Sequence, residues 1–278
     1  MEDFANINGV KICFQVQGEG YPLVLLHGFA MYKEFWKWHS QEFSKKFKVI
    51  TLDLRGCGYS DHPPETYSME ALADDVKSLL DYLDIERANV GGHSFGGMVA
   101  QQFALKHPKH LNKLILMSTF ANIPLDKSGL DMYQRSQLSF YDAKVKDPEN
   151  AFWVKMKQRF SRNFFKDMNQ NPQKLHHDMF TAEDLMHLEA TKGTSKPQDI
   201  LNQIYAITTH NTVDRLLDIK NATLILTAVK DRIISPSSCE LLNEKIPTSE
   251  LVMFKSSHFF MLEEAPDFIS EILNFLKQ

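Results

Sequence analysis

The sequence predicts an α/β fold with a mostly parallel central sheet, helices on both faces of that sheet and an inserted helical cap. Strand and helix patterns alternate at both ends of the 278-residue chain, which is the order of a parallel sheet with crossover helices. Between residues 120 and 213 this alternation lapses into helical periodicity without a convincing buried strand. The length suits one core with an insertion better than two large domains.

Apolar residue patterns place the individual elements. Before the insertion, a β-branched alternation and apolar runs predict strands at 10–16, 22–26, 47–52, 87–91 and 114–117. Apolar positions at helical spacing predict crossover helices at 67–83 and 95–106. After the insertion, strands are predicted at 222–227 and 250–254, and helices at 237–245 and 265–276. The core is therefore expected to comprise 1–119 and 214–278, and the cap 120–213.

Composition excludes several classes of partner. The 31 basic and 35 acidic residues give a net charge of −4, so the chain has no global electrostatic footprint for nucleic acid or an anionic membrane. Three widely spaced cysteines suggest neither a disulfide framework nor a zinc site. An acidic N-terminus and the lack of an apolar run of about 18 residues predict a cytoplasmic protein without a membrane span. We expect a monomer or homodimer.

The strongest motif is Gly92-His93-Ser94-Phe95-Gly96, directly between the strand 87–91 and the following helix. A sharp strand-to-helix turn imposes strained backbone angles on the serine, so the positions two before and two after it must lack side chains. Such a turn exposes the Ser94 hydroxyl above the sheet. The helix N-terminus beneath it offers backbone N–H groups to a developing oxyanion. Ser94 is therefore the candidate nucleophile.

Of eleven histidines, His258 is the candidate base, because it follows the last predicted strand and so lies at the same sheet edge as Ser94. In this architecture the acid lies between the serine and the histidine in the chain. Asp231 satisfies that order shortly after the strand 222–227, whereas the turn after 114–117 has no carboxylate until Asp126. Asp231 is therefore the candidate acid.

A further polar feature, His27-Gly28-Phe29, follows the buried strand 22–26 at the same edge. There the backbone N–H of Phe29 can join that of Phe95 in an oxyanion hole. A His-Gly pair considered alone is also typical of a tight turn without function. Four features in the right order at one sheet edge favour the functional interpretation.

Together these motifs resemble those of the α/β-hydrolase fold superfamily, and within it the small soluble branch with a helical cap. The resemblance covers both flanks but not the cap. It also rests on Asp53-Leu54-Arg55-Gly56-Cys57-Gly58-Tyr59-Ser60, which is expected to shape the loop after a strand. One departure is Ser257, because the family commonly has glycine before the histidine.

The resemblance implies acyl transfer without a metal or organic cofactor. His258 takes the proton of Ser94, Asp231 orients the imidazole, and the Phe29 and Phe95 N–H groups stabilise the oxyanion. Members that resemble epoxide hydrolases or dehalogenases use an aspartate nucleophile, so a serine disfavours those two reactions. Substrate contacts are expected from His27, Gly28, His93, Phe120 and Phe259.

The cap has apolar residues at helical spacing, namely Phe152, Met156, Phe160, Phe164 and Met168. Side chains of this kind either line an apolar pocket or pack the cap against the core, and packing is favoured. The opposite face is expected to be solvated and basic, with Lys155, Lys157, Arg159, Arg162 and Lys166. His176-His177-Asp178 lacks metal-ligand spacing and is expected at the surface.

The favoured function is hydrolysis of a small, fairly apolar carboxylic ester or lactone by a serine enzyme. Three alternatives stay open. Two use the same triad, which are a C–C bond hydrolase of a ring-cleavage diketone and a peroxidase-like side activity. The third is a weakly catalytic ligand receptor on this scaffold. The cap is expected to select the small-molecule substrate.

Overall fold

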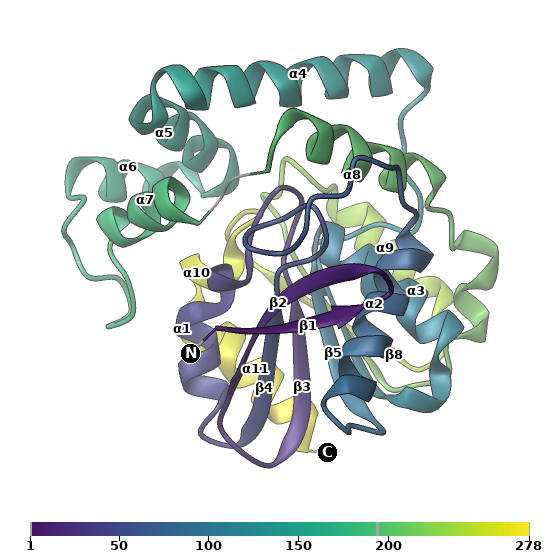
Figure 1. Cartoon of the computed structure of the whole chain (residues 1–278). Helices are drawn as coiled ribbons and strands as arrows, with labels where there is room; N and C mark the ends of the chain where they lie inside the picture. Colours follow the sequence, from purple (N-terminus) through teal and green to yellow (C-terminus); the bar gives the residue numbers. More distant parts are fainter. Residues whose placement is uncertain (1, 193–194, 278) are drawn as a thin grey trace.

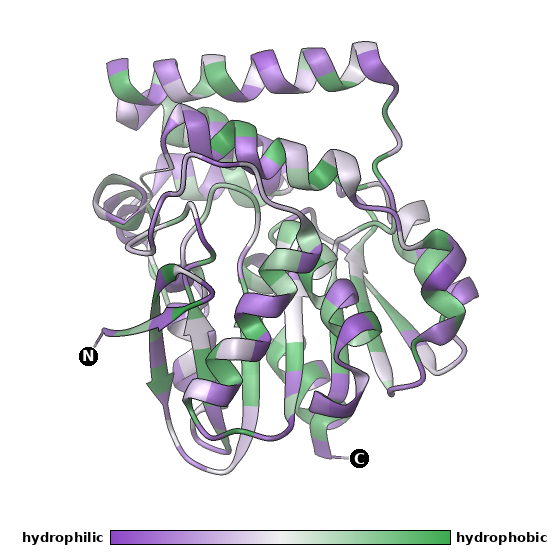
Figure 2. Ribbon diagram, turned by 45° about the vertical axis from the view of Figure 1, so that its right-hand side comes forward, coloured by the Kyte–Doolittle hydropathy of each residue, from purple (hydrophilic) through white to green (hydrophobic). Residues whose placement is uncertain are grey.

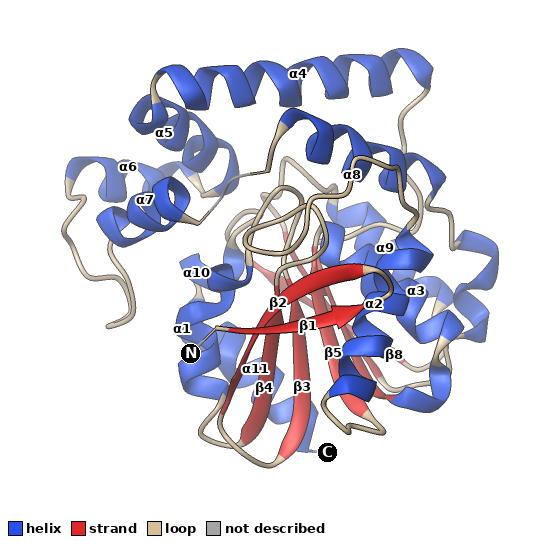
Figure 3. Cartoon of the chain, in the orientation of Figure 1, coloured by secondary structure: helices blue, strands red, loops and turns tan. Residues whose placement is uncertain are grey.

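The computed structural model describes residues 2–192 and 195–277, and these contain an eight-stranded sheet. The strand order is β1-β2-β4-β3-β5-β6-β7-β8, with antiparallel pairs at β1–β2 and β2–β4 and parallel pairs elsewhere. Helices lie on both sides of the sheet, and a further layer of helices lies above one end of its strands (Figures 1 and 3). The predicted fold class, a mostly parallel sheet with an inserted helical cap, is confirmed.

The predicted core elements form close to their expected bounds. The strands are β2 (Val10–Gln17), β3 (Tyr21–Leu26), β4 (Phe47–Leu52), β5 (Ala88–His93), β6 (Leu111–Met117), β7 (Thr223–Ala228) and β8 (Ser249–Phe254). The helices are α2 (Met69–Tyr82), α3 (Phe95–Lys106), α9 (Pro236–Lys245) and α11 (Ala265–Lys277). The largest difference is at β6, which begins at Leu111 rather than at 114.

Alternate side chains of the parallel strands are buried on opposite faces of the sheet. In β3, Val24 and Leu26 join the apolar cluster beneath α2, α3 and α9, whereas Leu23 and Leu25 join the cluster beneath α1 (Lys37–Phe43) and α11. Because helices cover both faces, these strands are continuous apolar runs, which is what makes them recognisable in the sequence.

Several short elements were not predicted. The strand β1 (Asp3–Ile7) pairs with β2 through a two-residue turn at Asn8 and Gly9, which have φ of 48° and 76°. Asn-Gly is typical of this turn, so the hairpin has a sequence signal. The others are too short to show periodicity: α1, α10 (Phe260–Glu263), η1 (Lys33–Trp36), η2 (Pro108–His110) and η3 (Val213–Asp218).

The cap helices lie between β6 and β7 and form the upper layer in Figure 1. They are α4 (Lys127–Lys146), α5 (Pro148–Arg159), α6 (Arg162–Gln170), α7 (Ala182–Thr191) and α8 (Pro197–Thr209). An antiparallel bridge between Asn122 and Asn211 brings the two ends of this inserted segment together. The exact core and cap boundaries at 120 and 213 stay a prediction.

The apolar cap stripe is divided between α5 and α6. The chain turns at Phe160 and Ser161, where the Ser161 N–H donates to the Glu263 carboxylate over 2.9 Å. Phe152 and Met168 on either side of the turn, like Phe160 itself, are buried in the cluster beneath α1. These side chains therefore pack the cap against the core.

Two polar residues of the cap are buried, contrary to expectation. Lys155 is buried and its Nζ contacts the carboxylate of Glu189 on α7. It follows Phe152 by three positions, and residues three apart share a helix face. His176 is buried with its ring 5.7 Å from that of Phe180. The basic residues that are exposed as expected are Lys157, Arg162 and Lys166.

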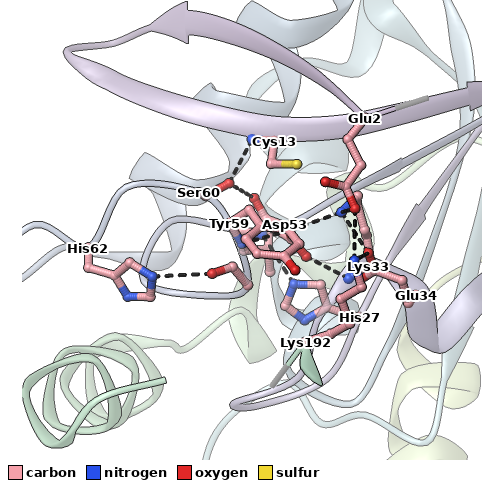
Figure 4. Close-up of polar contacts among 12 residues, drawn as sticks. Glu2, Cys13, His27, Lys33, Glu34, Asp53, Tyr59, Ser60, His62 and Lys192 are labelled. Carbon is pink, nitrogen blue, oxygen red and sulfur yellow. Dashed lines mark hydrogen bonds and ion pairs between the residues drawn. The ribbon is translucent and has the colours of Figure 1, made fainter. Parts of the chain in front are cut away.

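A buried network around Asp53 shapes the loop after β4 (Figure 4). Asp53 Oδ1 accepts the Lys33 backbone N–H over 2.7 Å, and its Oδ2 lies 3.3 Å from Lys33 Nζ and 3.0 Å from the Tyr59 nitrogen. The Ser60 hydroxyl donates to the Asp53 carbonyl over 2.6 Å and accepts the Cys13 N–H over 2.9 Å. This loop is thereby joined to both β2 and η1.

The same loop contacts the cap through His62, which is labelled in Figure 4. Its Nδ1 lies 2.7 Å from Asp199 Oδ2 on α8. The hydrogen bond to Asp199 raises the pKa of His62 above its ordinary value, although burial opposes this shift. A raised folded-state pKa stabilises the fold fully below the unfolded pKa of about 6.5, and this contribution is lost as the pH rises through the folded-state pKa.

We predict that Lys33→Met lowers the free energy of unfolding by about 3 kcal/mol, because the Asp53 carboxylate stays buried without its cation. Urea denaturation at neutral pH measures this loss. Lys45→Met is the control, since Lys45 pairs with Glu42 at the exposed surface and its loss is expected to be much smaller. Equal losses for the two variants would contradict a stabilising role of the network.

We predict that His62→Gln destabilises the protein more at pH 5 than at pH 9, because the ion pair with Asp199 needs a protonated imidazole. Urea denaturation at both pH values gives the difference from wild type. The control is His187→Gln, which alters an exposed histidine of α7. A pH-independent difference for His62→Gln is the result that refutes the prediction.

Candidate active site

The turn from β5 to α3 has strained geometry at Ser94. This residue has φ of 54° and ψ of −114°, outside the regions favoured by residues other than glycine. A Cβ at Gly92 would lie 2.1 Å from the Gly96 carbonyl oxygen, and a Cβ at Gly96 would lie 2.5 Å from that of Leu26. Both positions therefore exclude a side chain, as the motif predicts, and α3 begins directly against the end of β3.

Thr119 supports this turn from the end of β6. Its buried hydroxyl donates to the Ser94 carbonyl over 2.8 Å, while the Ser94 N–H donates to the Met117 carbonyl over 2.8 Å. Both backbone polar groups of Ser94 are thus held from the neighbouring strand. Sequence patterns gave no indication of Thr119, because a threonine after an apolar strand is common.

Asp231 and His258 meet after the neighbouring strands β7 and β8. Asp231 Oδ2 accepts a hydrogen bond from His258 Nδ1 over 2.7 Å. Its Oδ1 accepts the backbone N–H groups of Ile233 and Ile234 over 2.8 and 3.0 Å. Because Nδ1 is committed to the carboxylate, Nε2 is the imidazole nitrogen left to accept a proton.

The hydrogen bonds of Asp231 keep it ionised. Burial alone would raise the pKa of this carboxyl group. The charge and hydrogen bond of His258, together with the N–H groups of Ile233 and Ile234, lower the pKa. The net effect lowers the pKa of Asp231 below its ordinary value. The carboxylate is therefore negative at neutral pH and holds the His258 imidazole through a hydrogen bond to a charged acceptor.

The serine that replaces the family's glycine has a structural role. Ser257 is buried, and its hydroxyl donates to the Lys230 carbonyl over 3.1 Å. This bond joins the loop of His258 to the loop of Asp231. Ser257 is not among the residues with positive φ, so the backbone here does not require glycine.

The proposed oxyanion donors lie on either side of Ser94. Phe95 begins α3, and Gly28 precedes Phe29 in the loop after β3, where a Cβ at Gly28 would lie 3.6 Å from Ser94 Cβ. Within the described residues, neither the Phe29 nor the Phe95 backbone N–H donates to another protein group. Both donors are therefore free to bind a ligand oxygen.

A mostly apolar cavity of about 180 Å³ adjoins Ser94. The cavity walls come from the Phe29 loop, the start of α3, the cap and the loop after β7. Its apolar side chains include Phe120, Ile123, Tyr133, Ile207 and Ile234. The size and lining suit a small apolar group bound beside the Ser94 hydroxyl.

Only some of the residues that we expect to contact substrate lie at this cavity. Phe120 lines it, and Gly28 lies beside Ser94, but His27, His93 and Phe259 are not part of the lining. His27 is buried behind the loop, where its Nδ1 donates to the Gly28 carbonyl over 2.9 Å and its Nε2 accepts a backbone N–H over 3.1 Å. Its two ring nitrogens therefore hold the loop, and a contact of His27 with substrate stays a prediction.

His93 and Phe259 pack around His258. The His93 ring is buried 4.5 Å from the His258 ring, and burial lowers the pKa of His93 well below its ordinary value. Phe259 packs edge-on against Phe160 of the cap at 5.6 Å. These two side chains pack the histidine loop, and their contact with substrate stays a prediction.

Residues 2–192 and 195–277 contain no group of three or more His, Cys, Asp or Glu side chains that could hold a metal ion. In that same part of the chain, no helix has both the length and the hydropathy needed to cross a bilayer. Cys13, Cys57 and Cys239 are buried free thiols.

Comparison with known proteins gives a family match over most of the chain. A family profile described as alpha/beta hydrolase fold matches residues 21–265. The AB hydrolase superfamily protein YisY of Bacillus subtilis is 30% identical over 266 residues, which cover 93% of this chain and 92% of YisY. The solved structure of Est816, titled an N-acyl homoserine lactone degrading enzyme, superposes with a TM-score of 0.78 at 26% identity and covers 98% of this chain and 100% of Est816.

Higher identity is confined to a shorter segment. The uncharacterized protein Rv2715 of Mycobacterium tuberculosis is 39% identical over 115 residues, which are 41% of this chain and 34% of that protein. The match therefore spans about a third of the length of this relative.

We predict that Gly96→Ala destabilises the protein by about 3 kcal/mol or prevents folding, because the added Cβ overlaps the Leu26 carbonyl. Gly129→Ala is the matched control, since a Cβ there would approach no atom closer than 3.3 Å and alanine favours the helix α4. Thermal and urea unfolding compare the two. A Gly96→Ala protein as stable as Gly129→Ala would contradict the packing argument.

Proposed function

This chain belongs to the alpha/beta hydrolase fold family, and we propose that it is a serine hydrolase that cleaves a small, fairly apolar carboxylic ester or lactone. The proposal places it in the carboxylic ester hydrolase class. It is carried by one observation, which is that Ser94 adjoins an apolar cavity at the sheet edge where the Asp231–His258 pair lies. Such a pair is what activates a serine hydroxyl for attack on a carbonyl carbon.

In the proposed mechanism, Ser94 Oγ attacks the carbonyl carbon while His258 Nε2 takes its proton. The N–H groups of Phe29 and Phe95 bind the oxyanion of the tetrahedral intermediate. Collapse expels the alcohol, which receives the proton from His258, and leaves an acyl-enzyme on Ser94. Water, deprotonated by His258, then hydrolyses that ester and restores the serine.

The chemistry of the nucleophile and the cavity supports this choice of substrate. A serine forms an acyl ester, whereas opening an epoxide through a covalent alkyl intermediate needs a carboxylate nucleophile. The apolar lining around Phe120 and Ile207 favours a hydrocarbon group next to the carbonyl. The overall likeness to Est816, whose title names lactone degradation, supports including lactones.

We predict that Ser94→Ala lowers kcat for p-nitrophenyl acetate and butyrate by about 10⁴-fold or more and abolishes covalent labelling by a fluorophosphonate. Asp231→Asn is expected to lose about 10⁴-fold in kcat, because the imidazole then adopts the wrong tautomer. Ser139→Ala, an exposed serine of α4, is the control and retains wild-type turnover.

Absence of serine-dependent ester or lactone turnover, together with no labelling of Ser94, would overturn the proposed function. Turnover of a ring-cleavage diketone in the absence of ester turnover would favour C–C bond hydrolysis instead. Binding of a small apolar ligand without any turnover would favour the receptor alternative.

A further inference from the structure

A second cavity, of about 100 Å³, lies next to the cavity above Ser94 and is more polar. Phe29 lines both, so the two cavities adjoin at the loop after β3. Residues of α4 and α5, with Glu189 of α7, form the cap side of the second cavity. Arg159, at the end of α5, is among its lining residues.

The backbone of Arg159 places its side chain beside the histidine loop. Its carbonyl accepts the Phe259 N–H over 3.0 Å, and its guanidinium carbon lies 5.6 Å from the centre of the Phe259 ring. The guanidinium donates to the Lys155 carbonyl over 3.3 Å but, within the described residues, forms no ion pair with a carboxylate. A cation in this position leaves donors available to a ligand.

The second cavity has an excess of positive charge. Lys155, Lys144 and Arg159 line it with one carboxylate, Glu189, which already pairs with both lysines. Burial lowers the pKa of Lys155 to about 8, and the charge of Arg159 contributes to that lowering although Glu189 opposes it. Three cations therefore share this cavity with one carboxylate, and Glu189 interacts electrostatically with Arg159 as well as with the two lysines. The lining keeps an excess of positive charge that an anionic group of a ligand would balance.

We propose that Arg159 binds a carboxylate on the substrate, so that the preferred substrate is an ester or lactone with one apolar end and one anionic end. The inference rests on the proposed function and names its substrate class. The apolar end occupies the cavity beside Ser94, and the carboxylate lies in the second cavity. A guanidinium presents paired donors that match a carboxylate, which makes Arg159 a specificity-determining residue.

The test uses matched ester pairs that differ by one carboxylate. On the acyl side the pair is p-nitrophenyl hexanoate and mono-p-nitrophenyl adipate; on the alcohol side it is phenyl acetate and 4-acetoxybenzoate. The readout is the ratio of kcat/KM for the anionic ester to kcat/KM for its neutral partner. A loss of folded protein lowers both values equally, so this ratio responds only to recognition of the charge.

We expect Arg159→Gln to lower that ratio by about ten- to one-hundred-fold in at least one pair, as for the loss of a charge-assisted hydrogen bond. Arg159→Lys keeps the charge and is expected to restore part of the ratio. Arg135→Gln makes the same substitution at an exposed position of α4 and is expected to leave the ratio unchanged. An unchanged ratio in both pairs for Arg159→Gln would overturn the inference.

A binding measurement separates this inference from the proposed function. Calorimetric titration of Ser94→Ala with monomethyl adipate and with dimethyl adipate needs no turnover. We expect tighter binding of the monoester, and Ser94→Ala/Arg159→Gln should lose about tenfold of that affinity. Equal binding of the two esters by Ser94→Ala refutes recognition of a carboxylate even if ester hydrolysis is demonstrated. Preferential binding of the monoester supports it even if hydrolysis is not.

Discussion

The close approach of α3 to the ends of β5 and β3 is the constraint on which the candidate site depends. It requires bare backbone at Gly92 and Gly96, and it leaves Ser94 in a conformation that costs about 1–3 kcal/mol. Burial of the apolar side chains of α3, such as Met98 and Phe103, offsets that cost. The hydrogen bonds of Ser94 to β6 and Thr119 then hold the strained turn in one position.

Once α3 is fixed, the parallel sheet brings the loops that carry the other groups to the same edge as Ser94. The loops after β3, β7 and β8 all leave the same edge. The loop after β3 is secured by the hydrogen bond that His27 donates, the loop after β7 by the N–H that Asp231 accepts, and the loop after β8 by the hydroxyl that Ser257 donates. These groups have partners inside the protein, as buried polar groups require. Hydrogen bonds of buried polar groups therefore position the residues of the candidate site as much as apolar packing does.

The cap differs from the core in how its helix α4 is packed, because this helix contributes no buried residue to the apolar core. No residue of α4 is buried, and hydrophilic and hydrophobic bands alternate along it in Figure 2. Nevertheless Tyr133 lines the apolar cavity and Lys144 the polar one. Substitutions on such a helix change the cavity lining at little cost in stability. Under the proposed function, the core supplies the reaction and the cap selects the substrate.

Local sequence patterns predict the core strands and the order Ser94, Asp231, His258, because buried parallel strands and a glycine-bounded turn are visible in short segments of the chain. Contacts between distant segments set the rest: the support from Thr119, the inward position of His27, and the burial of Lys155 against Glu189. The sequence around a single threonine, histidine or lysine looks the same whether that side chain lies in solvent or in the interior. Its surroundings are set by segments far away in the chain, and it is those surroundings that place Arg159 beside a polar cavity.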